Sequence, residues 1–319
     1  MKRFHGIRTL AMLVFPLIAV EMVSAAPADS KLLSLVPPGT QLVAGECNRT
    51  PAGRPDGFLV AGRNSLVDRR DFISLAGADD SMVIRQMIFA AGGADPSTSG
   101  EHSILVSGRF DQARIFTAAV SNGATVTEFR GFRVLVQQPF ELELGTFKDV
   151  RWLAVIDSKV ALFGTRFSVQ QELDRYLDGS AVDPSLMQRL SRLRRDDATW
   201  SVLGMFTVDN ELEEAFGSLD PVLANLLHDR NSFQFGIRYG REVEVEYEVT
   251  VPSGAPAQLI SNFSTQSLVP VSSKGSSLLP RQDLAADRAS VHGVVKVTTT
   301  RYAAWLAQCA RAAVINRGN

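Results

Sequence analysis

The stretch REVEVEYEVTV (residues 241–251) places glutamates at every second position, at Glu242, Glu244, Glu246 and Glu248. Valine and tyrosine fill the positions between them. Successive side chains of a β-strand point to opposite faces, so this alternation predicts a strand with one apolar and one acidic face. Residues 232–239 (SFQFGIRY) alternate in the same way and predict the strand that pairs with it.

The length of the loop between these two strands decides which side chains share a face. A two-residue turn would pair Tyr239 with Glu242 and set apolar residues against acidic ones throughout. A three-residue loop over 239–241 pairs Arg238 with Glu242 and Ile237 with Val243 instead. A sheet with one buried face selects the odd loop. The sequence therefore predicts aromatic residues facing inward and the glutamates on a solvated face.

The acidic face itself has three functional interpretations. Alternate glutamates stand about 6.7 Å apart along a strand. That spacing is too wide for two of them to bind one small cation, whose oxygen ligands lie within roughly 2.5 Å of the metal. We therefore expect a solvated face, with a docking surface for a basic partner or a metal site as the alternatives.

The N-terminus has the features of a secretory signal peptide. Lys2, Arg3 and Arg8 precede an apolar run over residues 9–20, and small residues lead to Ala25. The run is too short to span a bilayer, which takes roughly 20 residues. We predict a signal peptide at residues 1–25 with cleavage near Ala25, and a secreted or periplasmic mature chain.

The rest of the chain excludes several classes of partner. Loss of residues 1–25 would make the net charge of −1 more negative by two units. A mildly acidic chain lacks the basic surface that nucleic acid requires, so no nucleic-acid partner is expected. No later segment is apolar enough to span a membrane. Export would place the chain where disulfides form, so the two cysteines, Cys47 and Cys309, are candidates for a disulfide. The alternative is that Cys309 is a core thiol of a C-terminal helix.

The order of predicted elements favours an α+β fold with mainly antiparallel sheets and helices packed on one face. Residues 103–110 are a strand, Asp111 an N-cap, 112–121 a helix, and 125–129 with 132–137 a hairpin. A second hairpin (150–156 and 159–164) and a helix (167–177) follow. Two units of the β-α-β-β type fit this order, at about 102–180 and 198–319. We divide the mature chain into an N-terminal unit (26–197) and a C-terminal unit (198–319), with one continuous domain as the alternative.

Common catalytic signatures are missing from the sequence. There is no P-loop, no Ser-x-x-Lys, no Gly-x-Ser-x-Gly, no His-Glu-x-x-His and no Cys-x-x-Cys. The mature histidines (His102, His228 and His292) each have an ordinary structural explanation, at a strand start, a helix end and a strand. The sequence therefore supplies no candidate catalytic, cofactor-binding or metal-binding residue, and no cofactor is expected.

Other charged segments are interpreted as solvated surface. Arginines at 189, 192, 194 and 195 flank the helical stripe of Leu186, Leu190 and Leu193, which predicts an exposed basic face with local ion pairs. Glu141 and Glu143 alternate with apolar residues, as on a strand. Asn48 and Asn262 fit the glycosylation pattern, which applies only to a eukaryotic source.

The segments SGRFDQARI, GFRVLV and WLAVIDSKVALFGT, followed by VQQELDRYL, resemble uncharacterised secreted bacterial α+β proteins with repeated strand-helix-hairpin units. The resemblance covers about residues 100–265 and implies no catalytic residues. The sequence as a whole favours an exported, non-enzymatic binding or structural protein, whose partner is a protein or an envelope component. The alternative is an exported hydrolase with a site assembled from dispersed residues.

Overall fold

The computed structural model describes residues 29–47, 72–73, 83–92, 101–138, 141–142, 145–146, 150–193, 199–203, 232–252, 281–285, 288–304 and 307. Its labelled helices are α1 (Ser30–Leu35), α4 (Gln112–Ser121), α5 (Arg166–Leu177) and α6 (Pro184–Leu190). The strands of the first half are β1 (Leu42–Cys47), β2 (Val83–Ala91), β3 (His102–Arg109), β4 (Thr125–Phe129), β5 (Phe132–Gln137), β6 (Glu141–Leu142), β7 (Gly145–Thr146), β8 (Arg151–Ile156) and β9 (Val160–Thr165). Those of the second half are β10 (Thr199–Leu203), β11 (Ser232–Tyr239), β12 (Val243–Pro252), β13 (Arg281–Ala285) and β14 (Arg288–Val297). The fold is α+β, as predicted.

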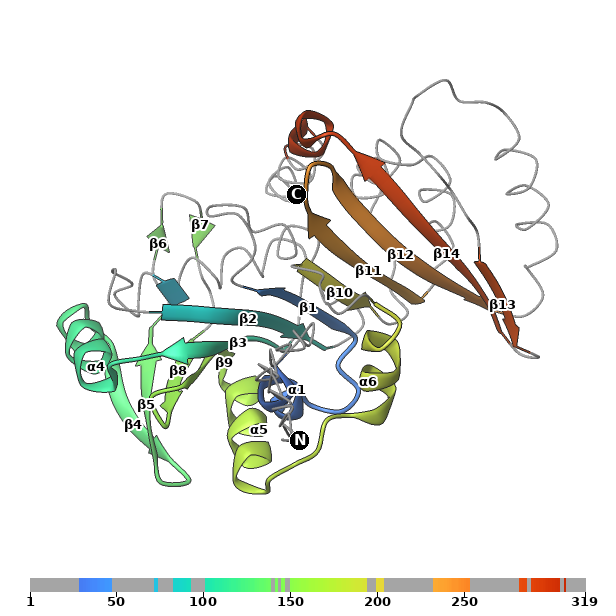
Figure 1. Cartoon of the computed structure of the whole chain (residues 1–319). Coiled ribbons are helices and arrows are strands. Elements are labelled where there is room, and N and C mark those ends of the chain that lie inside the picture. Colours follow the sequence, from blue (N-terminus) through green and yellow to red (C-terminus); the bar gives the residue numbers. More distant parts are fainter. Residues whose placement is uncertain are drawn as a thin grey trace, which may run out of the picture.

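Twelve of these strands form one antiparallel sheet (Figure 1). Its order is β13-β14-β12-β11-β10-β1-β2-β3-β9-β8-β5-β4, and β6 and β7 pair separately. The strand β1 is central because it pairs with β2 on one side and with β10 on the other. Strands from both predicted units thus lie in one sheet, hydrogen-bonded across the β1–β10 junction; the boundary at residue 197 stays a prediction.

Local turn chemistry explains the hairpins of the first half. Arg130 and Gly131 join β4 to β5 with φ of +52° and +84°, and Phe129 lies opposite Phe132. Positive φ at both central residues is the geometry that matches the twist of two-residue hairpins. Asp157 and Ser158 also have positive φ, but the loop between β8 and β9 has three residues, 157–159, because Ile156 lies opposite Val160. Both hairpins lie where the sequence predicts them.

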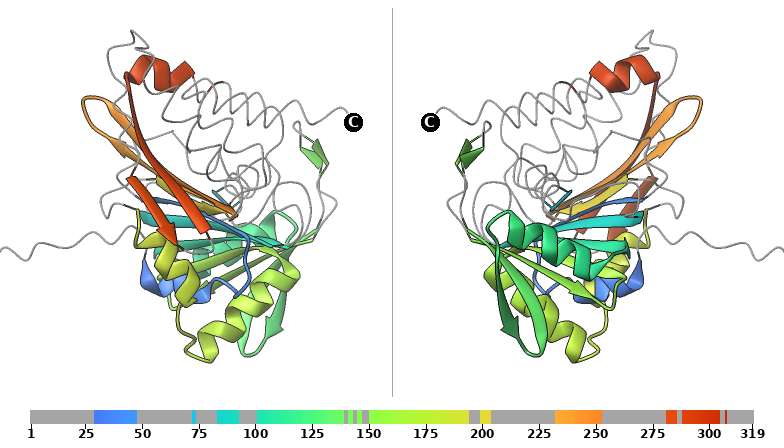
Figure 2. Two further views of the ribbon diagram at one scale, coloured as in Figure 1. Left: turned by 90° about the vertical axis from the view of Figure 1, so that its right-hand side faces the viewer. Right: turned by 90° about the vertical axis from the view of Figure 1, so that its left-hand side faces the viewer.

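The main core lies between one face of the sheet and the helices α1, α5 and α6 (Figure 2). Val169 and Leu173 of α5 are fully buried against it, and Leu190 of α6 is 2% exposed. Burying a side chain of this size stabilises the fold by roughly 1.5–3 kcal/mol. The apolar stripes of these helices therefore hold them on the sheet.

The helix α4 lies on the opposite face. Its N-cap Asp111 accepts a hydrogen bond from Arg114 N at 3.1 Å, as the sequence predicts. The guanidinium of Arg133 in β5 lies 4.7 Å from the centre of the Phe116 ring of α4. Its neighbour Val134 belongs to the main core, and adjacent strand residues point to opposite faces. The expectation of helices on one face thus describes α1, α5 and α6, while α4 covers the other.

Candidate functional site

The acidic strand β12 forms the predicted hairpin with β11. A three-residue loop, residues 240–242, joins them, and Tyr239 lies opposite Val243. The predicted odd loop is confirmed, but Arg238 pairs with Glu244 rather than with Glu242, so the predicted register is wrong by two residues. A shift of two residues leaves every side chain on its own face, so alternation alone does not distinguish the two registers.

The acidic face is only partly solvated. Glu242 is exposed and the side chain of Glu244 is 19% exposed, but Glu246 and Glu248 are each 7% exposed. Glu244 forms ion pairs with Arg238 and, at 3.0 Å, with Nζ of Lys296. The prediction of a solvated face is therefore wrong over the second half of the strand.

The helix α6 region explains the burial of Glu248. Oε1 of Glu248 lies 2.7 Å from Nη1 of Arg192, which follows α6. Nε2 of Gln234 in β11 donates to Oε2 of Glu248 at 2.5 Å. Arg189 Nε in turn donates to Oε1 of Gln234 at 3.4 Å. We call these four residues the α6 tie; it joins a helix to a strand that lies about 50 residues further along the chain.

The α6 tie corrects the interpretation of the arginine run. The leucine stripe is confirmed, with Leu186, Leu190 and Leu193 at 8%, 2% and 5% exposure. The arginines beside it were expected to form local ion pairs on a solvated face. Instead Arg192 pairs with the distant Glu248, while Arg194 and Arg195 lie outside the described residues. Glu248 thus has its basic partner in a segment of the same chain.

The α6 tie contains two positive charges, those of Arg189 and Arg192, and the one negative charge of Glu248. Burial lowers the pKa of Arg189 to about 10; Glu248 opposes this decrease and Arg192 adds to it. Arg189 stays cationic at neutral pH and is attracted to Glu248, the carboxylate that also forms the ion pair with Arg192. Removing that carboxylate would leave two positive charges next to each other at a packed interface.

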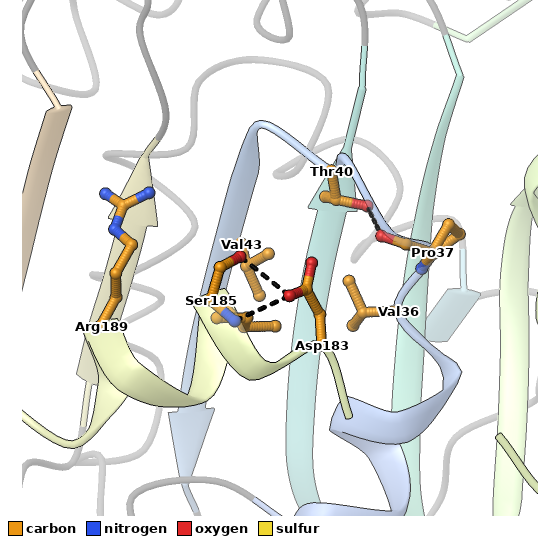
Figure 3. A pocket seen from close by; sticks show the side chains of 8 residues that line it. Val36, Pro37, Thr40, Val43, Asp183, Ser185 and Arg189 are labelled. Atoms are coloured by element: carbon orange, nitrogen blue, oxygen red, sulfur yellow. Dashed lines mark hydrogen bonds between the residues drawn. The ribbon is translucent and has the colours of Figure 1, made fainter. Parts of the chain in front are cut away.

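A small pocket lies on the other side of Arg189, between α6 and the segment that leads into β1 (Figure 3). It has a volume of about 40 Å³, which holds a few water molecules. Ligand pockets are roughly 300–1,000 Å³. The residues that line it are Val36, Pro37, Thr40, Val43, Asp183, Ser185, Leu186 and Arg189.

The polar groups of this pocket are engaged in local structure. The carboxylate of Asp183 accepts hydrogen bonds from N and Oγ of Ser185, both at 2.8 Å (Figure 3). These bonds cap α6 and lower the pKa of Asp183. Thr40 Oγ1 donates to the carbonyl of Pro37 at 2.7 Å. The Ser185 hydroxyl therefore donates to a capping carboxylate, an arrangement that orders a helix start.

A second polar pair lies deep in the main core, between β3 and α5. Ser103 Oγ and Glu172 Oε1 are hydrogen-bonded, and Glu172 is fully buried. Glu172 Oε2 has no hydrogen-bond partner in the part of the chain that the structure describes. Burial raises the pKa of Glu172 to about 8, against a smaller lowering by Ser103. Glu172 is thus a neutral acid at neutral pH.

Sequence analysis did not single out Glu172. The signal was present, because Val169, Glu172, Leu173 and Tyr176 share one helical face. Val169 and Leu173 are buried in the core, so the acid between them is buried too. An acid within an apolar helical stripe is the pattern that identifies such a group.

Gly164 of β9 allows the strands around this pair to approach closely. It lies opposite Ser103, and a Cβ at position 164 would lie 2.4 Å from the carbonyl oxygen of His102. His102 is 5% exposed on the other face, with Nε2 3.0 Å from Nη2 of Arg151. The strand-start explanation of His102 is confirmed, and its ring is a buried neighbour of a cation.

The remaining singled-out residues are dispersed. His292 lies in β14 with its backbone opposite Glu248, and Glu141 begins β6. Cys47 ends β1. Several predictions lie outside the described residues: the signal peptide, His228, Glu143, Asn48, Asn262, Cys309 and hence the disulfide.

Neither a search for metal sites and membrane-spanning helices nor a comparison with known proteins adds a candidate functional site. Among the described residues, no group of three or more His, Cys, Asp or Glu side chains is placed to hold a metal ion. No helix in the described part of the chain is long and apolar enough to cross a membrane. No family model, no curated protein and no solved structure matches the chain.

Proposed function

We propose that the chain is an exported, non-enzymatic protein with a binding or structural role in the periplasm or at the cell exterior. The observation that carries this proposal is the position of its polar groups. Glu248 connects the acidic strand to α6, and the Ser103–Glu172 pair lies inside the core between β3 and α5. These groups connect helices to the sheet, which is a structural use of polar side chains.

The small pocket and the buried histidine support the same proposal. General acid–base catalysis requires a side chain within hydrogen-bond reach of a substrate atom. His102 is 5% exposed and faces Arg151, and the α6 pocket has room for only a few waters. Export is supported by the basic start at Lys2 and Arg3 and by the apolar run that follows.

Export is tested by expressing the chain in a Gram-negative host and sequencing the N-terminus of the protein released by osmotic shock. We expect the released protein to begin at Ala26, and Ala25→Trp to block that cleavage because the peptidase requires a small residue there. Retention of Met1 on a cytoplasmic protein would contradict export.

The non-enzymatic role is tested with the same purified protein. We expect no turnover above the blank with chromogenic esters, phosphoesters, glycosides or peptides. A photo-crosslinker at an exposed position such as Met187 should trap an envelope protein, whereas saturable turnover that a point substitution abolishes would support the hydrolase alternative.

A further inference from the structure

Acids and hydroxyls line the contact between β3 and α5. Glu101, which precedes β3, and Ser103 are two residues apart, and both contact α5. Ser168 and Glu172 are four residues apart, so they lie one turn apart on the side of α5 that faces the strand. Ser103 is hydrogen-bonded to Glu172, and Ser168 Oγ lies 3.5 Å from Oε2 of Glu101. We call these four residues the α5 polar cluster; Glu101 is its exposed end and Glu172 its buried end.

The buried end of this cluster accommodates a neutral acid. Glu172 is fully buried, and its Oε1 is hydrogen-bonded to Ser103. In the part of the chain that the structure describes, its Oε2 has no hydrogen-bond partner. A buried carboxylate requires a cation or several hydrogen-bond donors to offset the loss of its hydration. The closed contact therefore favours the protonated form of Glu172.

The cations of α1 and α5 interact with other groups. Nζ of Lys31 in α1 lies 2.8 Å from Oδ2 of Asp157. The guanidinium of Arg166, at the start of α5, is exposed and lies 5.3 Å from the centre of the Trp152 ring. Nε of Arg175 donates to a backbone carbonyl of α1 at 2.9 Å. Each of these positive charges is thus engaged away from the buried acid.

The sheet under α5 offers the buried acid no positive charge nearby. Glu101 and Arg109 share the face of Ser103, but Arg109 lies at the far end of β3, about 20 Å along the strand. Arg151 and His102 lie on the other face, because their neighbours in sequence face α5. The residues of β8 and β9 that face the helices are uncharged: Trp152, Ala154, Ile156, Val160, Leu162 and Gly164. Loss of the buried proton would therefore place two negative charges in the α5 polar cluster and no positive charge among its members.

The two halves of α5 are held on the sheet by different kinds of contact. In the second half, Oδ1 of Asp174 lies 3.2 Å from Nε of Arg130, and the OH of Tyr176 donates to Asp157 at 3.3 Å. The bond from Arg175 to α1 adds to these contacts. The first half has three buried residues, two of them polar: Ser168, Val169 and Glu172. The first half is therefore the part of the helix whose contact with the sheet depends on the buried acid.

We propose that the first half of α5 (residues 166–172) separates locally from β3, and that Glu172 releases its proton to solvent when it does so. In the closed form the acid keeps its proton and its bond to Ser103. In the open form water reaches the carboxyl past Ser168, the hydroxyl that lies between it and the exposed Glu101. The sheet and the second half of α5 stay in place. The contact between β3 and α5 is thus a pH sensor built into the core, and it depends neither on export nor on the absence of catalysis.

The pH dependence of this opening has a defined direction and range. Burial raises the pKa of Glu172 from 4.5 to about 8 in the closed form, and the hydrated carboxyl of the open form returns to about 4.5. Between these values the closed form holds a proton that the open form has released. The closed form is therefore favoured most below pH 4.5 and loses this advantage up to about pH 8. Within this range the open population grows about tenfold for each pH unit.

Hydrogen–deuterium exchange of the full purified chain, followed by mass spectrometry, measures the opening. The native chain and Glu172→Gln are compared at the same pH, from pH 4.5 to above pH 8, so that the effect of pH on the exchange chemistry cancels. We expect the ratio of their exchange rates in α5 to rise about tenfold per pH unit and to level off above about pH 8. Glu172→Met, a second variant without the ionisable group, should behave like Glu172→Gln.

Three controls separate this opening from other changes. Val169→Ala loosens the same half of α5 without changing its ionisable groups, so it should raise exchange by one factor at every pH. In the native chain, α4 contains no acid, so its exchange should gain less with pH than that of α5. The amides that pair β3 with β9 should exchange more slowly than those of α5, because the strands stay paired. Circular dichroism should show that all variants are folded.

Two outcomes would overturn the proposal. The first is an exchange ratio between the native chain and both Glu172 variants that does not change with pH. The second is exchange in α5 that is no faster than in β3 and β9, because Glu172 would then reach solvent only when the whole chain unfolds.

Discussion

Glu172→Gln tests how a buried acid contributes to the stability of the fold. The glutamine has nearly the same shape but no ionisable proton. In the native chain, burial raises the pKa of Glu172 from 4.5 to about 8, and Ser103 is its hydrogen-bond partner. Glu101 is a second acid near the start of α5, the helix that carries Glu172. It is hydrogen-bonded to Thr165, and its Oε2 lies 3.5 Å from Ser168 Oγ.

The direction of the pH dependence follows from how many protons the folded and the unfolded chain bind. Between pH 4.5 and about 8 the folded chain keeps the proton of Glu172 and the unfolded chain releases it. The free energy of unfolding therefore falls as the pH rises through this range. The Glu172 contribution is fully present below pH 4.5 and is lost by about pH 8. A displacement of about 3.5 units, at about 1.4 kcal/mol each, amounts to about 5 kcal/mol.

Urea denaturation followed by far-UV circular dichroism, at intervals from pH 5 to pH 8.5, measures this decrease. We expect the unfolding free energy of the native chain to fall by several kcal/mol relative to Glu172→Gln. Glu128→Gln, at an exposed position on β4, is the matched control and should follow the native profile. Ser103→Ala should extend the decrease to higher pH, because Ser103 lowers the pKa of Glu172 in the folded chain while the onset near pH 4.5 depends on the unfolded chain. Parallel profiles for the native chain and Glu172→Gln would refute the reasoning.

Three further predictions concern packing and covalent structure. Glu248→Ala should destabilise the chain by roughly 3 kcal/mol, and Arg192→Ala should destabilise it by less because the Arg192 side chain is 46% exposed. A double-mutant cycle should give a coupling energy of about 1 kcal/mol between the two residues, and independent effects would contradict the α6 tie. Gly164→Ala should lower the free energy of unfolding, measured by thermal unfolding, by roughly 1–3 kcal/mol. Gly92→Ala should lower it much less, because a Cβ at position 92 meets nothing within 4 Å. Equal losses would contradict the close approach of β9 to β3. If Cys47 and Cys309 form a disulfide, thiol labelling of the unreduced, denatured protein should detect no free thiol, and two labelled thiols would exclude the bridge.

Local elements are predictable from this sequence because their signals are local. Asp111 caps α4, and the Arg130-Gly131 turn fixes the β4–β5 hairpin to the residue. The leucine stripe from Leu186 to Leu193 identifies the buried side of the α6 segment. Each signal lies within a few residues of the structure that it specifies.

The order of strands and the register of β11 with β12 are not local. No pattern in β1 indicates that β2 and β10 are its neighbours, since any apolar strand fits that position. The hairpin loop begins one residue later than predicted, which shifts the pairing of the two strands by two residues. The Tyr239 ring packs edge-to-face on Tyr302, with ring centres 5.9 Å apart, and this contact favours Tyr239 as part of the strand. Tyr302 lies about 60 residues further along the chain, so this contact has no local signal.

Alternation of polar and apolar residues specifies the two faces of a strand, but not what covers each face. The acidic face of β12 was expected to be solvated because acids are usually exposed. Glu248 is buried because α6 packs its leucines on the sheet, and the Arg189 and Arg192 side chains are then near the acid. An acidic strand face and a helix with arginines flanking a leucine stripe are each ordinary alone. Found in one chain, the two are electrostatically complementary, and this complementarity favours a contact between the helix and the strand.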